Sequence, residues 1–125
     1  MKIKNYIELF FITLIIIIIF TALDYFTHKL SLEYYVPLTY FTNKIIFGTL
    51  IGFGALIFLN KISWGKRALL MSLIVSVLLQ TRYYLEGYPK EFVFEFMLFH
   101  FLMLIISSLL IFWIYYRNKK VKFWQ

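Results

Sequence analysis

Cysteine is absent from the chain, and acidic residues, proline and glycine are scarce. Without cysteine the protein has no disulfides, no thiolate metal ligands and no thiol nucleophile. The sequence also lacks the G-x-S-x-G nucleophile elbow, the Gly-rich phosphate loop and the H-E-x-x-H zinc motif. These absences remove several enzyme classes, and no cofactor is predicted.

Apolar residues dominate what is present: 62% of the 125 residues are hydrophobic and 22% are aromatic. A soluble domain of this size buries too little of its surface to hide so much apolar area. A lipid bilayer removes that difficulty because it is itself an apolar solvent. We therefore predict one integral membrane domain over residues 1–125, in contact with lipid and without a separate soluble domain.

Four apolar segments have roughly the 20 residues that a helix needs to cross a bilayer. We predict membrane-spanning helices at residues 6–25, 37–59, 68–85 and 92–116. The connections between them are short, which favours antiparallel neighbours in an all-α, up-down-up-down four-helix bundle. A basic start followed by an apolar run is also typical of a signal peptide. No small-residue cleavage site follows the first segment, so we expect it to stay as an anchor.

The basic residues divide unequally between the two sides of the predicted bundle. One side carries Lys2, Lys4, Lys61, Lys66, Arg67, Arg117, Lys119, Lys120 and Lys122, and the other carries Lys29, Lys44, Arg82 and Lys90. Of the acidic residues, only Glu8 falls on the first side. The positive-inside rule then predicts a multi-pass protein of the cell membrane with both termini in the cytoplasm, N-in and C-in.

The net charge of +7 does not indicate nucleic-acid binding, because the basic residues flank apolar spans instead of lining a folded basic surface. Tyrosines agree with the predicted topology, since this side chain favours the membrane–water interface. The residues expected near the outer interface are Tyr25, Tyr34, Tyr35, Tyr40, Tyr83, Tyr84 and Tyr88.

Small residues recur at four-residue steps in the second and third spans. Gly48 and Gly52 form a G-x-x-x-G pattern, and Ala68, Ser72 and Ser76 lie on one helical stripe. In lipid, such smooth faces let helices approach closely. We predict that the two faces pair with each other. The same faces are alternative contacts for a homo-oligomer or a larger membrane partner.

Polar and ionisable residues gather in the predicted outer half of the bundle. These candidate ligand-binding residues are Asp24, His28, Asn43, Lys44, Gln80, Arg82, Glu95 and His100. At about 1.5 Å per residue, His100 lies roughly 12 Å along its helix from Phe92. Ionisable groups at such depth are costly unless they pair or line a wet cavity. We predict an outward-facing polar pocket for a small polar solute, an ion or a lipid headgroup.

Several of these residues also have a purely structural explanation. Lys44 and Arg82 are long enough to snorkel to the outer headgroups. Glu95 is either a proton carrier or a first-turn carboxylate stabilised by the helix dipole. His100 is the deepest, but one interhelical hydrogen bond is enough to satisfy a histidine.

Asp24 and His28 are four residues apart, a spacing that suits a metal, an acid–base pair or a hydrogen bond at a helix end. Because no known zinc motif surrounds them, no metal site is predicted. For Asn43 and Gln80 we expect interhelical hydrogen bonds.

Three functions remain open. The first is binding or transport through the outward-facing pocket, and the second is a non-catalytic assembly or stabilising subunit of a larger membrane complex. The third is a membrane-embedded enzyme at the outer leaflet, with Asp24/His28 and Glu95/His100 as acid–base or metal groups. The sequence favours a protein without catalytic activity over the third.

Overall fold

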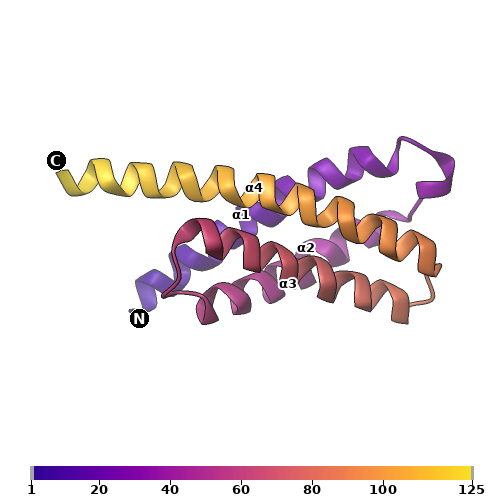
Figure 1. Ribbon diagram of the computed structural model, residues 1–125, viewed down its shortest axis with the longest axis horizontal. Coiled ribbons are helices and arrows are strands. Elements are labelled where there is room, and N and C mark those ends of the chain that lie inside the picture. The colour runs from indigo at the N-terminus through magenta and orange to yellow at the C-terminus, as the bar shows by residue number, and fades with distance from the viewer. Residues whose placement is uncertain (1, 125) are drawn as a thin grey trace.

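The computed structural model describes the backbone of residues 2–124 and the side chains of residues 2–118. Four long helices make up the chain, namely α1 (Ile3–His28), α2 (Leu38–Phe58), α3 (Trp64–Leu85) and α4 (Lys90–Trp124). A short 3-10 helix, η1 (Leu32–Tyr34), lies between α1 and α2. The predicted all-α four-helix bundle is confirmed. Figure 1 shows consecutive helices running in opposite directions, with both chain ends at the same end of the bundle.

The membrane orientation stays a prediction. The end with the 29–37 and 86–89 connections is called the outer end below, after its predicted side, and the opposite end is called the inner end. Lys119, Lys120 and Lys122 contribute to the predicted orientation, and their side chains lie outside the described residues.

The helices are longer than their apolar stretches. The first helix continues to His28, about one turn past its predicted end, and the third begins at Trp64 instead of residue 68. In both places the helix carries polar residues into its terminal turn. Hydropathy defines the part of a helix that sits in lipid, whereas backbone hydrogen bonding continues into the interface.

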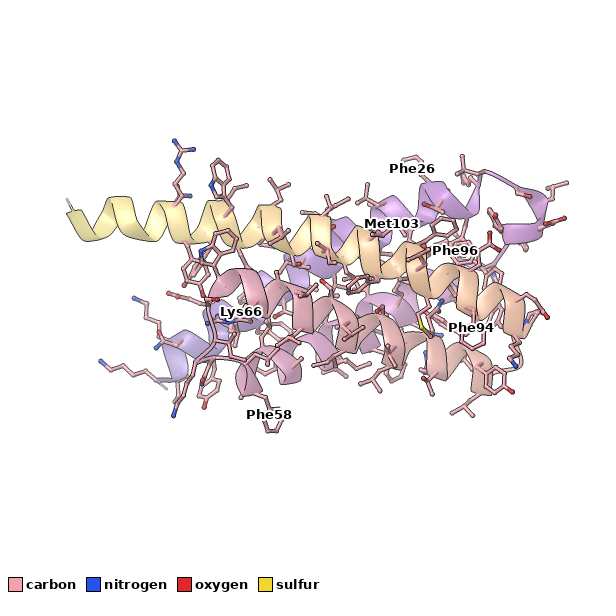
Figure 2. The ribbon with its side chains drawn as sticks, viewed as in Figure 1. Phe26, Phe58, Lys66, Phe94, Phe96 and Met103 are labelled. Atoms are coloured by element: carbon pink, nitrogen blue, oxygen red, sulfur yellow. The ribbon has the colours of Figure 1, made fainter. Side chains whose placement is uncertain are left out.

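All four helices are long and apolar enough to span a membrane. Their outward faces expose large apolar side chains, such as Phe26 at 67% and Phe58 at 91%, and Figure 2 shows both pointing away from the bundle. Exposed apolar surface on this scale suits lipid and not water. The helix α4 has 35 residues, and its last turns extend beyond the other three helices in Figure 1.

Glycines let α2 approach α1 closely. A Cβ atom added to Gly52 would lie 2.9 Å from Cγ2 of Thr13, and one added to Gly48 would lie 3.2 Å from Cγ2 of Ile17. Because Thr and Ile are β-branched and stiff, these side chains have little room to give way. The glycine face therefore fixes the spacing between the first two helices.

The predicted pairing of the two small-residue faces with each other is wrong. Where the glycine face meets α3, its neighbours are the larger side chains of Leu79, Val75 and Met71. Ser72 turns instead to α4, where its hydroxyl lies 3.3 Å from that of Ser108. A glycine stripe can accommodate large side chains, so it does not require a small-residue partner.

Both small-residue faces are covered within the single chain, since Gly48, Gly52 and the Ala68/Ser72/Ser76 stripe are all buried. A homo-oligomer or a larger partner remains a prediction. Such a contact would have to use the outward faces of the helices.

Candidate functional site

Three helices bring four ionisable side chains together in the outer half of the bundle. Asp24 and His28 come from α1, one turn apart on the same face, while Lys44 comes from α2 and His100 from α4. We call these four residues the Asp24 cluster. The sequence analysis named all four, and the structure places them in direct contact.

The Asp24 carboxylate lies at the centre of the Asp24 cluster. Its Oδ2 atom accepts a hydrogen bond from the Lys44 ammonium and lies 3.2 Å from Nε2 of His28. Its Oδ1 atom lies 3.0 Å from Nε2 of His100. The Lys44 ammonium also lies 2.9 Å from that same Nε2 atom and donates to the Tyr40 hydroxyl at 3.2 Å. Every member therefore contacts the carboxylate directly.

The Asp24 cluster is closed to the surroundings of the bundle. Asp24, Lys44 and His100 have no exposed surface, and His28 is 4% exposed. Charges in such an environment are costly unless they are paired and hydrogen-bonded. The alternative that Lys44 snorkels to the outer headgroups is wrong, because its ammonium is more strongly attracted to the buried carboxylate.

Aromatic rings hold the two imidazoles in place. Phe96 stacks on His28 with ring centroids 4.2 Å apart, and Phe20 meets His100 edge-on at 5.1 Å. Both phenylalanines are fully buried. The rings exclude water and limit rotation of the imidazoles, so the nitrogen atoms that face Asp24 are preorganised.

The hydrogen bonding of His28 determines which of its nitrogens carries a proton. Nδ1 lies 2.6 Å from the backbone carbonyl of Tyr34, which only accepts hydrogen bonds, so Nδ1 must carry the hydrogen. In the neutral ring, Nε2 then presents a lone pair to the Asp24 carboxylate oxygen 3.2 Å away. Two acceptors would then face each other, and this arrangement requires a positive charge either between them or on the ring, where a second proton makes Nε2 a donor.

His100 has an equivalent conflict. Its Nε2 atom lies close both to the Asp24 carboxylate, which accepts, and to the Lys44 ammonium, which donates. A single ring nitrogen satisfies only one of these neighbours at a time. Its other nitrogen, Nδ1, is buried and has no hydrogen-bond partner within the described part of the chain.

A small hollow at the outer end borders one member of the Asp24 cluster, His28. Its volume is about 130 Å³, and it is lined by Tyr25, His28, Lys29, Tyr35, Val36, Leu38 and Phe41. His28 therefore lies between this hollow and the Asp24 carboxylate. The hollow is formed mainly by α1, α2 and the connection between them.

The other predicted site residues lie apart from the Asp24 cluster. Arg82 pairs with Glu86 at 3.0 Å and stacks over the ring of Phe47. Glu95 is exposed and accepts a hydrogen bond from the Tyr34 hydroxyl at 2.7 Å. Glu95 contacts Tyr34, whereas His100 contacts Asp24. The Glu95/His100 pair of the enzyme hypothesis is therefore not formed.

Gln80 forms the hydrogen bond between helices that was expected for it, whereas Asn43 does not. The amide of Gln80 donates to the backbone carbonyl of Val93 at 3.0 Å, which confirms the expected hydrogen bond between helices. Asn43 is partly exposed, and its side chain makes no hydrogen bond to the described residues, so the same expectation for Asn43 is wrong. Asn43 directly precedes Lys44 in the helix, and adjacent helical residues point in different directions, so Asn43 does not share the buried face of Lys44.

Tyr40 and Tyr83 were both expected at the membrane interface, but in the structure they belong to the site. Tyr40 and Tyr83 are 3% and 1% exposed, and their rings stack with centroids 4.5 Å apart. The Lys44 ammonium lies 4.3 Å from the centroid of the Tyr40 ring, which is cation–π distance. Tyr40 lies four residues before Lys44, and this spacing was the signal that could have revealed it.

The inner end carries its own polar contacts, which the sequence analysis did not anticipate. Arg67 donates to the Tyr116 hydroxyl at 2.8 Å and to the carbonyls of Asn60 and Ile62. The carboxylate of Glu8 accepts from the Tyr115 hydroxyl at 2.9 Å. These side chains line a half-open hollow of about 170 Å³. They are less buried than the Asp24 cluster.

Metal ligation is within reach of three residues of the Asp24 cluster. One ligand atom from each of Asp24, His28 and His100 lies within 4.8 Å of the others, and all three residues are buried. The Lys44 ammonium lies among the same atoms. The arrangement can therefore hold positive charge in more than one form.

Comparison with protein-family models, with curated proteins and with solved structures finds no match. The fold and the lipid-facing surface define a small multi-pass membrane protein built as a four-helix bundle. Its function is proposed below from the geometry of the Asp24 cluster.

Proposed function

We propose that this membrane protein binds a cation at the Asp24 cluster, which the cation reaches from the outer end. One observation carries the proposal: a fully buried carboxylate is surrounded by an ammonium and two imidazoles from three helices. Buried ion pairs contribute little net stability compared with apolar packing. In membrane segments, ionisable residues are rare and usually serve a function.

A cation suits the site better than a larger polar solute. The side chains of the Asp24 cluster are in mutual contact, and no exposed surface is left on three of them. The Lys44 ammonium is itself a cation held by the carboxylate, on a flexible four-carbon chain. Withdrawal of this side chain would free one coordination position without moving any helix.

The hollow beside His28 supports entry from the outer end. It has room for a few water molecules, and it borders the one member of the Asp24 cluster that retains exposed surface. Rotation of the His28 ring would connect the hollow to Asp24. Stacking on Phe96 and the bond to the Tyr34 carbonyl hold that ring in its closed position.

Thermal unfolding of the full chain in detergent micelles tests the proposal. A ligand that binds only the folded state stabilises it by about 2.7 kcal/mol at 100 times its Kd. Chlorides of Na⁺, K⁺, Ca²⁺, Zn²⁺ and Co²⁺ are compared with choline chloride at equal ionic strength. We expect at least one cation to raise Tm in the wild type and in Glu33→Gln, an exposed control, but not in Asp24→Asn.

Two results would overturn the proposal. One is the absence of any cation-dependent change in Tm in the wild type. The other is an equal change in Asp24→Asn, since that would place the binding site elsewhere in the chain.

A second candidate function is the assembly or stabilising subunit. The observation in its favour is that the Asp24 carboxylate links α1 to α2 through Lys44 and α1 to α4 through His100. Such contacts could serve only to hold the bundle together. This function predicts co-purification with a larger membrane protein, unchanged in the double variant Asp24→Asn/Lys44→Met, and no response to cations.

A further inference from the structure

We propose that the cation is a divalent transition metal of the zinc type, bound by Asp24, His28 and His100 in competition with the Lys44 ammonium. This inference rests on the proposed function and names its ligand class. It follows from the spacing of the ligand atoms, the hydrogen bonding of His28 and the chemistry of the donor set.

Two of the distances between ligand atoms are close to those in a four-coordinate site. Zinc bonds to nitrogen and oxygen are about 2.0–2.2 Å long, so tetrahedral ligand atoms lie roughly 3.3 Å apart. Nε2 of His28 lies 3.2 Å from Oδ2 of Asp24, and Nε2 of His100 lies 3.0 Å from Oδ1. The three ligand atoms, one from each residue, all lie within 4.8 Å of one another, so binding of one ion would require side-chain rotations that draw them together.

The second partner of His28 is the one that zinc-bound histidines usually have. A metal-binding imidazole almost always donates its other N–H to a carbonyl, a carboxylate or water, which fixes the tautomer. Here Nδ1 of His28 is bonded to the Tyr34 carbonyl, and the ring is stacked on Phe96. In the neutral ring the lone pair of Nε2 faces the carboxylate, and a metal bound between the two would remove the repulsion between acceptors.

The donor set selects the kind of metal. Two imidazoles and one carboxylate favour Zn²⁺, Co²⁺, Ni²⁺ or Cu²⁺, whereas Ca²⁺ and Mg²⁺ prefer oxygen ligands and higher coordination numbers. The Lys44 ammonium lies among the ligand atoms and beside the Tyr40 hydroxyl, so it must withdraw before an ion binds there. Water could fill the fourth coordination position once the lysine withdraws.

Lys44 lowers the affinity of the proposed site for metal. Its ammonium neutralises the carboxylate when no metal is bound, and a divalent ion must displace this internal competitor. Replacement of Lys44 by an uncharged side chain leaves the carboxylate without its cation. The variant should therefore bind metal more tightly than the wild type, which is the opposite of what loss of a ligand would do.

Co²⁺ and Zn²⁺ titrations of the full chain in detergent test the inference. Co²⁺ gives visible d–d absorption when four-coordinate, and Zn²⁺ binding is followed by calorimetry. We expect Lys44→Met to bind one ion per chain at least tenfold more tightly than the wild type. Lys90→Met removes an exposed lysine from the same end of the bundle, away from the hollow beside His28, and should bind like the wild type. Addition of His28→Ala or His100→Ala to Lys44→Met should remove the absorption.

The results separate the inference from the proposed function. If Na⁺, K⁺ or Ca²⁺ stabilises the wild type while Co²⁺ and Zn²⁺ bind neither chain, the metal assignment is wrong and cation binding stands. If no cation acts on the wild type or on Lys44→Met, both are wrong. If Lys44→Met does not fold, the wild type decides: Co²⁺ absorption that His28→Ala abolishes supports the inference. Absence of that absorption, or its persistence in His28→Ala, overturns it.

Discussion

Nε2 of His28 faces the Oδ2 atom of Asp24 at 3.2 Å, while the opposite nitrogen of the same ring is bonded to a backbone carbonyl. Two acceptors at this distance repel each other unless a positive charge lies between them or on the ring. The Lys44 ammonium supplies part of that charge from the side. The contact between His28 and Asp24 thus calls for positive charge, from the lysine, from a second proton on the ring or, as we propose, from a bound cation.

Removal of either charge of the buried pair should destabilise the bundle strongly. Asp24→Asn leaves the Lys44 ammonium without its carboxylate, and Lys44→Met leaves the carboxylate without its ammonium. Loss of one partner of a buried pair costs about 3–5 kcal/mol, because the other remains buried and charged. The double variant should lose less than the sum of the single variants, by about 0.5–3 kcal/mol.

Unfolding by sodium dodecyl sulfate in mixed micelles, followed by circular dichroism, measures these free energies. Measurements are made without added metal, so that no cation replaces Lys44. Strictly additive losses would mean that the two residues do not interact, in contradiction to the structure. Glu33→Gln, an exposed carboxylate at the outer end, serves as the matched control and should be close to neutral.

Close packing between α1 and α2 can be tested with a pair of glycines on one helix. Gly52→Val should cost about 1–3 kcal/mol, because a Cβ atom there already meets Cγ2 of Thr13 at 2.9 Å. Gly54 has no atom within 4 Å of its added Cβ, so Gly54→Val should be nearly neutral. The same unfolding assay applies. Equal losses at both positions would contradict the described packing.

The predicted membrane orientation is testable because the natural chain has no cysteine. Ser31→Cys lies in the outer connection and Ser63→Cys in the inner one. A membrane-impermeant maleimide applied to intact cells should label Ser31→Cys, and it should label Ser63→Cys only after permeabilisation. The reverse pattern would invert the orientation and place the hollow beside His28 on the cytoplasmic side.

Tyr34 links the outer connection to α4 through a bond that depends on pH. Its phenol donates to the Glu95 carboxylate, and this hydrogen bond, together with burial and nearby negative charge, raises the pKa of Tyr34 above its ordinary value. The favoured form is the protonated one. The link therefore stabilises the connection below about pH 10 and is lost as the pH rises through the raised pKa of Tyr34.

Ultraviolet difference titration of the wild type against Tyr34→Phe isolates the ionisation of this tyrosine. We expect its pKa to fall towards the ordinary value in Glu95→Gln, because the carboxylate charge is removed. An unchanged titration in Glu95→Gln would show that the Tyr34–Glu95 bond does not form in solution.

Composition and the length of the apolar segments were sufficient to predict the four spans, because lipid contact imposes one requirement along the whole length of each helix. The depth of Asp24, Lys44 and His100 followed from the same reasoning, since residue number converts to height along a helix. The direction in which Arg82 and Glu95 point around their helix axes could not be predicted from the same reasoning. Arg82 and Glu95 have heights similar to the Asp24 cluster, but Glu95 is exposed and Arg82 is only partly buried.

The interior role of Tyr40 was missed for a related reason. Tyrosine is common at membrane interfaces, so its position near the outer end was a sufficient explanation from the sequence alone. The packing shows that the Tyr40 ring lies next to the Lys44 ammonium and against Tyr83. The hydrogen bond between His28 and the backbone carbonyl of Tyr34 could not be predicted either, because a main-chain acceptor has no sequence signature.

X-ray absorption at the zinc edge offers the most direct view of the proposed site. The Lys44→Met chain is loaded with one equivalent of Zn²⁺, and its spectrum is compared with that of the Lys44→Met/His100→Ala chain. We expect a four-coordinate shell at about 2.0–2.2 Å with the outer scattering of two imidazoles in Lys44→Met, and loss of this scattering in the double variant. A shell of oxygen atoms without imidazole scattering would contradict metal binding by Asp24, His28 and His100.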